Sequence, residues 1–160
     1  MKSSQALTSR LSARVSFIEF QQSLPSRTDV IDPFIAQITR FIARFRGAGN
    51  RDTDIELALR EALANAIVHG NREDPGQRVA VICRCGTNGE VSITVQDEGE
   101  GFDYDSVPDP TAPETRLRAT GRGIYLMKAL MDDVRFEQRG AVVHMRKKAN
   151  ADSAGERRAG

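Results

Sequence analysis

The chain has 160 residues, of which 28% are charged and 39% hydrophobic, and its formal net charge is +1. This length indicates one domain with a core large enough to fold alone, and the composition is that of a soluble globular protein. A charge so close to zero gives no global field to attract nucleic acid or an anionic membrane, so we expect neither as a direct partner.

The sequence contains no segment that predicts membrane insertion or export. No stretch approaches the roughly 20 apolar residues of a membrane helix, and the N-terminal MKSSQALTSRLSA lacks the apolar core of a secretory signal. We therefore expect a cytoplasmic location. Cys83 and Cys85 are two positions apart, on one face of a predicted strand. They are too close in sequence for an easy disulfide and lack nearby zinc ligands, so we expect free thiols.

The first half of the chain predicts one strand followed by two helices. Residues 13–24, ARVSFIEFQQSL, alternate apolar and polar side chains as a strand does. Apolar residues recur with helical spacing over residues 29–46, where Asp32-Pro33 suits the first turn. A second helix is expected from capping residues at 52–54 to a stop at Gly70-Asn71.

The second half predicts two pairs of strands with a helix between them. The pattern places strands at 78–85, 90–97, 134–138 and 141–147, and a helix at 123–133. The resulting order, β-α-α-β-β-loop-α-β-β, predicts an α+β fold. We expect a two-layer sandwich in which a mixed or antiparallel sheet is covered on one face by three helices.

The second helix carries a stripe of polar residues beside its apolar face. Glu61, Asn65 and His69 advance by about 40° per step on a helical wheel, which places them along one flank. A solvated helix face would explain this pattern. The alanines around them, at positions 62, 64 and 66, also leave room for another group to approach.

The strand at 90–97 runs directly into DEGEGFD, residues 97–103. Glycines at 99 and 101 allow close backbone approach and unusual φ angles, and Asp97 can accept hydrogen bonds from a planar amine. This pattern also occurs in hairpin turns and in calcium loops. Asp103 and Asp105 could add oxygen ligands, but the spacing to a closing glutamate is wrong for calcium.

A second glycine pattern, Gly121-Arg122-Gly123, comes directly before the predicted third helix. The exposed N–H groups of a helix N-terminus form a ready anion site, although a glycine-containing loop before a helix is common. The Walker pattern GxxxxGK[ST] is absent from the sequence, and the βαβ context of a dinucleotide-binding Rossmann unit is also missing.

Three segments in this order resemble the GHKL (Bergerat-fold) ATPases, the superfamily that includes gyrase and the histidine kinases. EALANAIVHG, residues 61–70, resembles the N box of that family, Glu-x-x-x-Asn-x-x-x-His. DEGEGF, residues 97–102, resembles the first glycine box, and GRGIYLMKALMDDV, residues 121–134, resembles the second box with its helix. Within the superfamily the chain is most similar to the bacterial anti-sigma-factor serine kinases. The likeness spans roughly residues 14–148.

The resemblance implies roles for the polar stripe. Asn65 would hold the Mg²⁺ that bridges the phosphates of ATP, and an amide oxygen suits that cation. Glu61 would be the general base that takes the proton of the incoming hydroxyl. His69 would have a structural role at the end of the helix.

The resemblance also implies how ATP binds. Asp97 would accept a hydrogen bond from the exocyclic amine of adenine, and Gly99 and Gly101 would let base and sugar lie close. The phosphates would be bound by the backbone of four consecutive residues, Gly121, Arg122, Gly123 and Ile124. Arg122 departs from the family pattern, which more often has a non-basic residue there. The arginine that often precedes this motif has its nearest counterpart at Arg118.

The resemblance divides the chain into three parts. Residues 14–148 would form the ATPase-like domain, with an ATP lid at about 102–120. Outside this domain, residues 1–13 and 149–160 are expected from their composition to be disordered tails.

The activity implied is that of an ATP-dependent serine-protein kinase and anti-sigma factor. Such a protein binds a sigma factor and phosphorylates a serine on an anti-anti-sigma partner of the STAS class, and it is a homodimer. An alternative is a nucleotide-binding protein that sequesters its partner without significant phosphotransfer. A second alternative is a fold relative that has lost nucleotide binding.

Overall fold

The computed structural model describes residues 16–46, 52–101 and 119–149. The expected N-terminal tail, residues 150–160 of the expected C-terminal tail and residues 102–118 of the expected lid lie outside these ranges, as does Arg118.

Five strands and three α-helices make up the described structure. The strands are β1 (Phe17–Pro25), β2 (Arg78–Gly86), β3 (Val91–Asp97), β4 (Asp133–Glu137) and β5 (Val142–Lys147). The helices are α1 (Ile31–Arg46), α2 (Thr53–Ala64) and α3 (Ala119–Leu130). Shorter helical segments are η1 (Thr28–Val30), η2 (Asn65–Gly70) and η3 (Gln138–Gly140).

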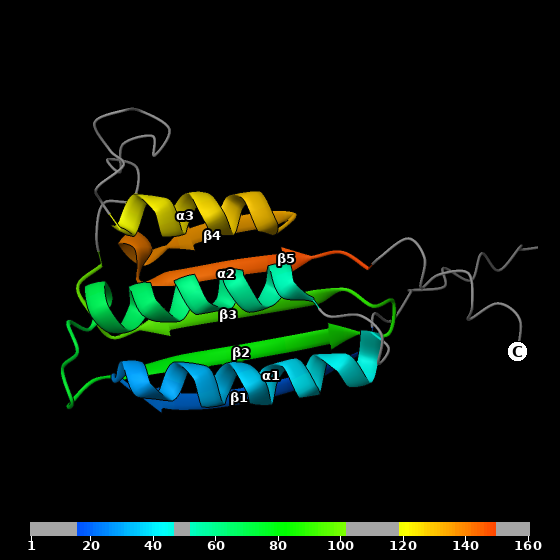
Figure 1. Cartoon of the computed structure of the whole chain (residues 1–160), viewed down its shortest axis with the longest axis horizontal. Helices are drawn as coiled ribbons and strands as arrows, with labels where there is room; N and C mark the ends of the chain where they lie inside the picture. The colour runs from blue at the N-terminus through cyan, green and yellow to red at the C-terminus, as the bar shows by residue number, and fades with distance from the viewer. Residues whose placement is uncertain (1–15, 47–51, 102–118, 150–160) are drawn as a thin grey trace, which may run out of the picture.

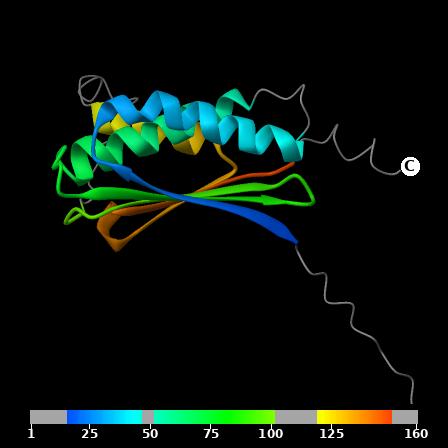
Figure 2. The same cartoon turned by 90° about the horizontal axis from the view of Figure 1, so that it is seen from below.

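The strands form one sheet in the order β1-β2-β3-β5-β4, and all four neighbouring pairs are antiparallel. Of the two sheet types expected, the structure therefore forms the antiparallel one. All three helices lie on the same side of the sheet (Figure 2), and α2 lies between α1 and α3 (Figure 1). This is the predicted α+β sandwich of two layers.

Alternation along β3 explains how the sheet presents a carboxylate to the helix layer. Val91, Ile93 and Val95 are buried at alternate positions, and Asp97 continues the same alternation at the end of the strand. Because side chains two apart on a strand share a face, Asp97 points to the side that the helices cover. The cysteines on β2 follow the same rule, and Cys83 and Cys85 are buried free thiols, as expected.

The second predicted helix is not one continuous α-helix. The α-helical part ends at Ala64, and Asn65–Gly70 forms a π-helical turn. The N–H of Asn71 bonds to the carbonyl of Ala66 at 2.8 Å, five residues back instead of four. Single π-turns of this kind are frequent at functional sites.

The third helix also differs from the prediction. It runs from Ala119 to Leu130, whereas helical periodicity had placed it at 123–133. The glycines at 121 and 123 are therefore inside the helix rather than directly before it, and residues 119 and 120 of the expected lid belong to its first turn. The early end at Leu130 lets β4 begin at Asp133.

Among the described residues, no helix is long and apolar enough to span a lipid bilayer.

Candidate nucleotide-binding site

Glu61 lies on α2, and Asn65 lies one turn later at the start of η2. Both side chains face α3. Opposite them is Gly123. A Cβ atom built on Gly123 would lie 2.7 Å from Glu61 Oε2 and 3.6 Å from Asn65 Oδ1. The three residues therefore converge, although 58 or more positions separate Gly123 from the other two in the chain. Glycine at this position is what allows α3 to approach the two polar side chains so closely.

Asp97 ends β3 and is 6% exposed. Its N–H donates to the carbonyl of Ala141 at 2.9 Å, which fixes it to the start of β5. Its Oδ1 accepts the N–H of Gly99 at 2.9 Å. Burial raises the pKa of the Asp97 carboxyl above its ordinary value, and the bond from Gly99 offsets part of that rise. The buried carboxylate therefore keeps acceptor capacity for a further donor.

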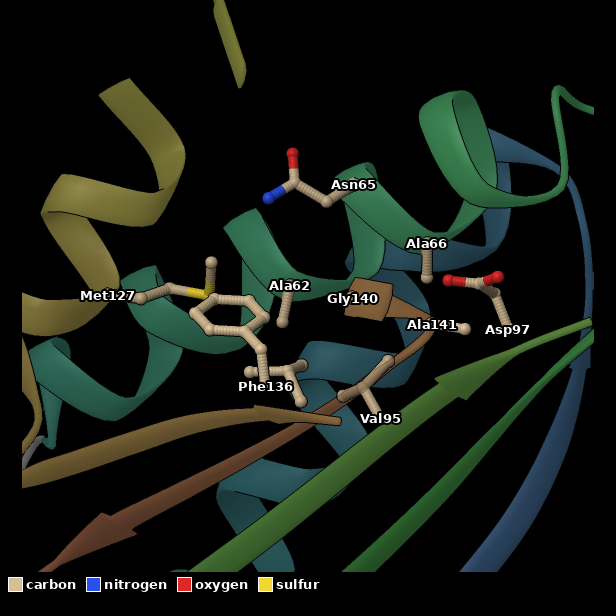
Figure 3. Close-up of a pocket in the computed structure, with 10 residues that line it drawn as sticks. Ala62, Asn65, Ala66, Val95, Asp97, Met127, Phe136, Gly140 and Ala141 are labelled. Carbon is tan, nitrogen blue, oxygen red and sulfur yellow. The ribbon is translucent and has the colours of Figure 1, made fainter. Parts of the chain in front are cut away.

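One cavity lies between the helix layer and the sheet and includes both Asn65 and Asp97. The free space among its lining residues, part of it open to solvent, is about 280 Å³. Small and apolar side chains form the rest of its wall: Ala62, Ala66, Val95, Met127, Phe136, Gly140, Ala141 and Val143. Figure 3 shows the carboxylate of Asp97 beside Ala66, with Phe136 and Met127 at the end farther from Asp97. An apolar slot with a few polar groups at its edge is the usual form of a small-molecule site.

The glycines of the turn after β3 have the properties that the sequence predicted. A Cβ on Gly99 would overlap the carbonyl oxygen of Gly70, so the two backbones are in contact. Gly101 has φ +77°, and a Cβ there would lie 2.5 Å from the carbonyl oxygen of Arg139. The turn after β3 therefore contacts the end of η2 through Gly99 and the turn before β5 through Gly101.

The remaining predicted residues are placed differently. Gly121 lies in the first turn of α3, where N–H groups have no intrahelical acceptor, whereas Gly123 and Ile124 lie deeper in the helix, where N–H groups bond within it. Ile124 is buried and Arg122 is exposed. Gly123 is thus the point at which α3 approaches Glu61 and Asn65, and its predicted part in phosphate binding stays a prediction.

His69 does not share the cavity of Asn65 and Asp97. It lies within the π-turn Asn65–Gly70. It is exposed, and it lines a separate and wider opening of about 630 Å³ together with Arg72, Gln77 and Glu100.

The sequence reasoning missed two groups of residues. The first is the apolar wall formed by β4, β5 and the turn between them, including Phe136 and Ala141. The strand alternation was visible in the sequence, but not that β5 would pair with β3 and β4 with β5. The second is Gly70 and Asn71, which were interpreted only as a helix stop. A Cβ on Gly70 would overlap the Asp97 carboxylate, and Asn71 is a buried side chain at 2% exposure.

Comparison with known proteins agrees with this geometry. The model of the histidine kinase-like ATPase domain matches residues 24–147. Serine-protein kinase RsbW of Bacillus subtilis (strain 168) is 35% identical over 107 residues, which are 62% of this chain and 66% of that protein. Anti-sigma F factor of Heyndrickxia coagulans is 32% identical over 118 residues, 69% of this chain and 79% of that protein.

A further relative covers more of the chain. Serine-protein kinase RsbW of Bacillus velezensis is 27% identical over 150 residues, 89% of this chain and 91% of that protein. The chain therefore belongs to the histidine kinase-like ATPase domain family and, within it, to the anti-sigma-factor kinases, as the three sequence segments predicted.

Proposed function

We propose that this protein is an ATP-dependent serine-protein kinase and anti-sigma factor. The observation that carries the proposal is the convergence of Glu61, Asn65 and Gly123 beside the cavity that contains Asp97. A protein that only sequestered a partner would not need a carboxylate and an amide that converge on α3 beside this cavity.

The buried carboxylate of Asp97 is suited to adenine. Its side chain accepts only one hydrogen bond from the described residues, the one from Gly99. The exocyclic amine of adenine would supply a second donor, and the apolar side chains that line the cavity would cover the faces of the base. Guanine has a carbonyl at that position and would leave the carboxylate opposed by another acceptor.

Asn65 is the residue that would hold Mg²⁺. Its Nδ2 is buried and makes no hydrogen bond to any residue that the structure describes. A half-turn of the amide exchanges Nδ2 and Oδ1, so the same side chain can present its oxygen to a cation. Within 16–46, 52–101 and 119–149, no group of three acidic, histidine or cysteine side chains could hold a metal alone. A single amide oxygen from Asn65 fits Mg²⁺, because this cation takes few protein ligands. The bound cation would offset the charge of the phosphates.

In the proposed reaction, the hydroxyl oxygen of a protein serine attacks the γ-phosphorus of ATP. The new O–P bond forms as the bond to the β,γ-bridging oxygen breaks, and ADP leaves with that electron pair. Glu61 takes the proton of the serine hydroxyl. The first-turn N–H groups of α3, including that of Gly121, would bind phosphate oxygens.

The names of the relatives support a sigma factor as one of the proposed partners. Anti-sigma F factors are named for action on a sigma factor, and the RsbW proteins are named serine-protein kinases. For this chain we propose a sigma factor as the sequestered partner, an anti-anti-sigma protein of the STAS class as the phosphate acceptor, and a homodimer as the working state.

Transfer of label tests this function directly. The full chain is incubated with magnesium and γ-labelled ATP, together with a candidate STAS-domain antagonist. We expect label on one serine of the antagonist and none when that serine is replaced by alanine. ATP binding without label on any serine would support the sequestering protein instead. Failure of magnesium-ATP to raise the melting temperature would support a relative that has lost nucleotide binding.

A further inference from the structure

Asn71 joins chain segments that are far apart in sequence. Its Nδ2 donates to Ser26 Oγ at 2.6 Å, just after β1, and to the carbonyl of Arg78 at 2.8 Å, at the start of β2. Its Oδ1 accepts the N–H of Glu98 at 2.8 Å, just after β3. At 2% exposure, the side-chain amide therefore uses both of its donors and one lone pair inside the protein.

The bond to Glu98 acts on the residue that adjoins Asp97. Gly70, which precedes Asn71, packs its Cα against the carboxylate of Asp97 and leaves no room for a side chain. Asn71 and Gly70 thus contact the turn after β3 at two points: Asn71 bonds to its backbone, and Gly70 contacts the carboxylate of Asp97. The N–H of Asn71 bonds to the carbonyl of Ala66, which lines the same cavity as Asp97. This bond connects Asn71 to the cavity wall.

The backbone after Asn71 shows how firmly it is held. Arg72 and Glu73 both have positive φ, 52° and 55°. For residues other than glycine, this backbone conformation is unfavourable. Such a turn persists only where the surroundings determine it, and the buried bonds of Asn71, together with that from the Glu73 N–H to Ile67 (2.8 Å), provide this.

We infer that Asn71 is a positioning residue, which sets the place of Asp97 and thereby the selectivity of the site for a 6-amino purine. This inference rests on the proposed function, because it requires Asp97 to bind the base. Only an amide fits the role: aspartate would lose both donors, and a leucine of similar size would leave the Glu98 N–H without an acceptor.

The test compares the affinity of the full chain for ATP and for inosine triphosphate, which carries a 6-oxo group in place of the amine. In Asn71→Ala we expect the preference for ATP to fall about tenfold, the effect of one displaced hydrogen bond. Ser26→Ala is the matched control, since it removes one bond of Asn71 but keeps that to Glu98. It should lower the melting temperature and leave the preference unchanged. Equal loss of preference in both variants would show a general loss of structure and overturn the inference.

The variant Asp97→Asn distinguishes failure of this inference from failure of the proposed function on which it rests. If Asp97→Asn loses the preference and Asn71→Ala keeps it, only the positioning role is wrong. If Asp97→Asn itself keeps the preference, the nucleotide site is misplaced and the inference fails with it. In the Asp97→Asn background, Asn71→Ala should cause no further loss of preference, and a further tenfold loss would contradict action through Asp97.

One measurement on the unaltered chain serves if Asn71→Ala does not fold. The bond to Asn71 should protect the Glu98 amide hydrogen from exchange with solvent, whereas exchange at the rate of an open loop would overturn the inference.

Discussion

The Cα of Gly123 faces the carboxylate of Glu61 so closely that a methyl group on it would lie 2.7 Å from Oε2. Glu61 is half-buried on α2, and Gly123 belongs to α3. The contact brings the proposed general base against the helix whose first turn would bind phosphate. The geometry of catalysis therefore depends on the absence of a side chain at position 123.

Gly123→Ala should separate activity from stability. Alanine favours helix over glycine, so the free energy of unfolding should stay within about 1 kcal/mol of the original value. The added methyl group must displace the Glu61 side chain, and a misplacement of this size can lower the transfer rate about a hundredfold. Thermal unfolding and labelled-phosphate transfer measure the two effects. An unchanged transfer rate would show that Glu61 is not in its working position here.

Glu61→Gln should retain ATP binding and lose phosphotransfer. Glutamine keeps the size of the side chain but cannot take the serine proton, and general-base catalysis contributes about 100- to 10,000-fold. Glu56→Gln is the matched control, because Glu56 lies on the same helix but lines a cavity next to α1. Calorimetric ATP titration and phosphotransfer kinetics distinguish the roles; equal loss of binding and transfer would assign Glu61 to folding.

Asn65→Ala should remove the dependence of ATP binding on magnesium. We expect the unaltered chain to bind ATP more tightly with magnesium than with a chelator present. If Asn65 supplies the protein ligand, the variant should bind ATP equally under both conditions. A magnesium effect of the original size in Asn65→Ala would place the metal elsewhere.

Burial of Asp97 predicts a pH dependence with a definite sign. Since burial raises its pKa in the folded chain, the folded state holds this proton more tightly than the unfolded state. The ionised carboxylate therefore destabilises the unliganded protein above the folded-state pKa, and the cost disappears as pH falls through that value. Asp97→Asn should melt at a higher temperature than the original chain at neutral pH, and the gap should close on acidification. A gap that widens towards acid would mean that the pKa is lowered.

Gly70→Ala should weaken ATP binding without touching the nucleotide. Its methyl group would overlap the Asp97 carboxylate and push it from the cavity, and such overpacking destabilises by about 1–3 kcal/mol. Gly76→Ala, in the exposed turn before β2, is the control and should change neither property. Full ATP affinity in Gly70→Ala would show that Asp97 need not be where the structure has it.

Much of the fold was predictable because buried apolar residues recur in the sequence with the period of a strand or a helix. Alternation in 90–97 predicted β3 with Asp97 at its end, and helical spacing predicted α1 with Asp32 in its first turn. The π-turn at Asn65–Gly70 was not predictable, since a shift of each hydrogen bond by one residue leaves the apolar pattern nearly unchanged.

The long-range contacts that position the site residues were also not predictable from the sequence. Asn71 bonds to residues 27 and 45 positions away, which no local pattern encodes. The early start of α3 was missed because Gly121 and Gly123 disfavour helix interiors. Packing against α2, where Gly123 meets Glu61, provides what local propensity does not.

Calorimetric titration of Asp97→Ala with magnesium-ATP tests most directly whether ATP binds in the cavity lined by Asn65 and Asp97. The variant should keep its fold and show no measurable ATP binding, because the base then has no partner for its amine. Binding of ATP at the affinity of the unaltered chain would mean that the nucleotide does not enter the cavity between Asn65 and Asp97.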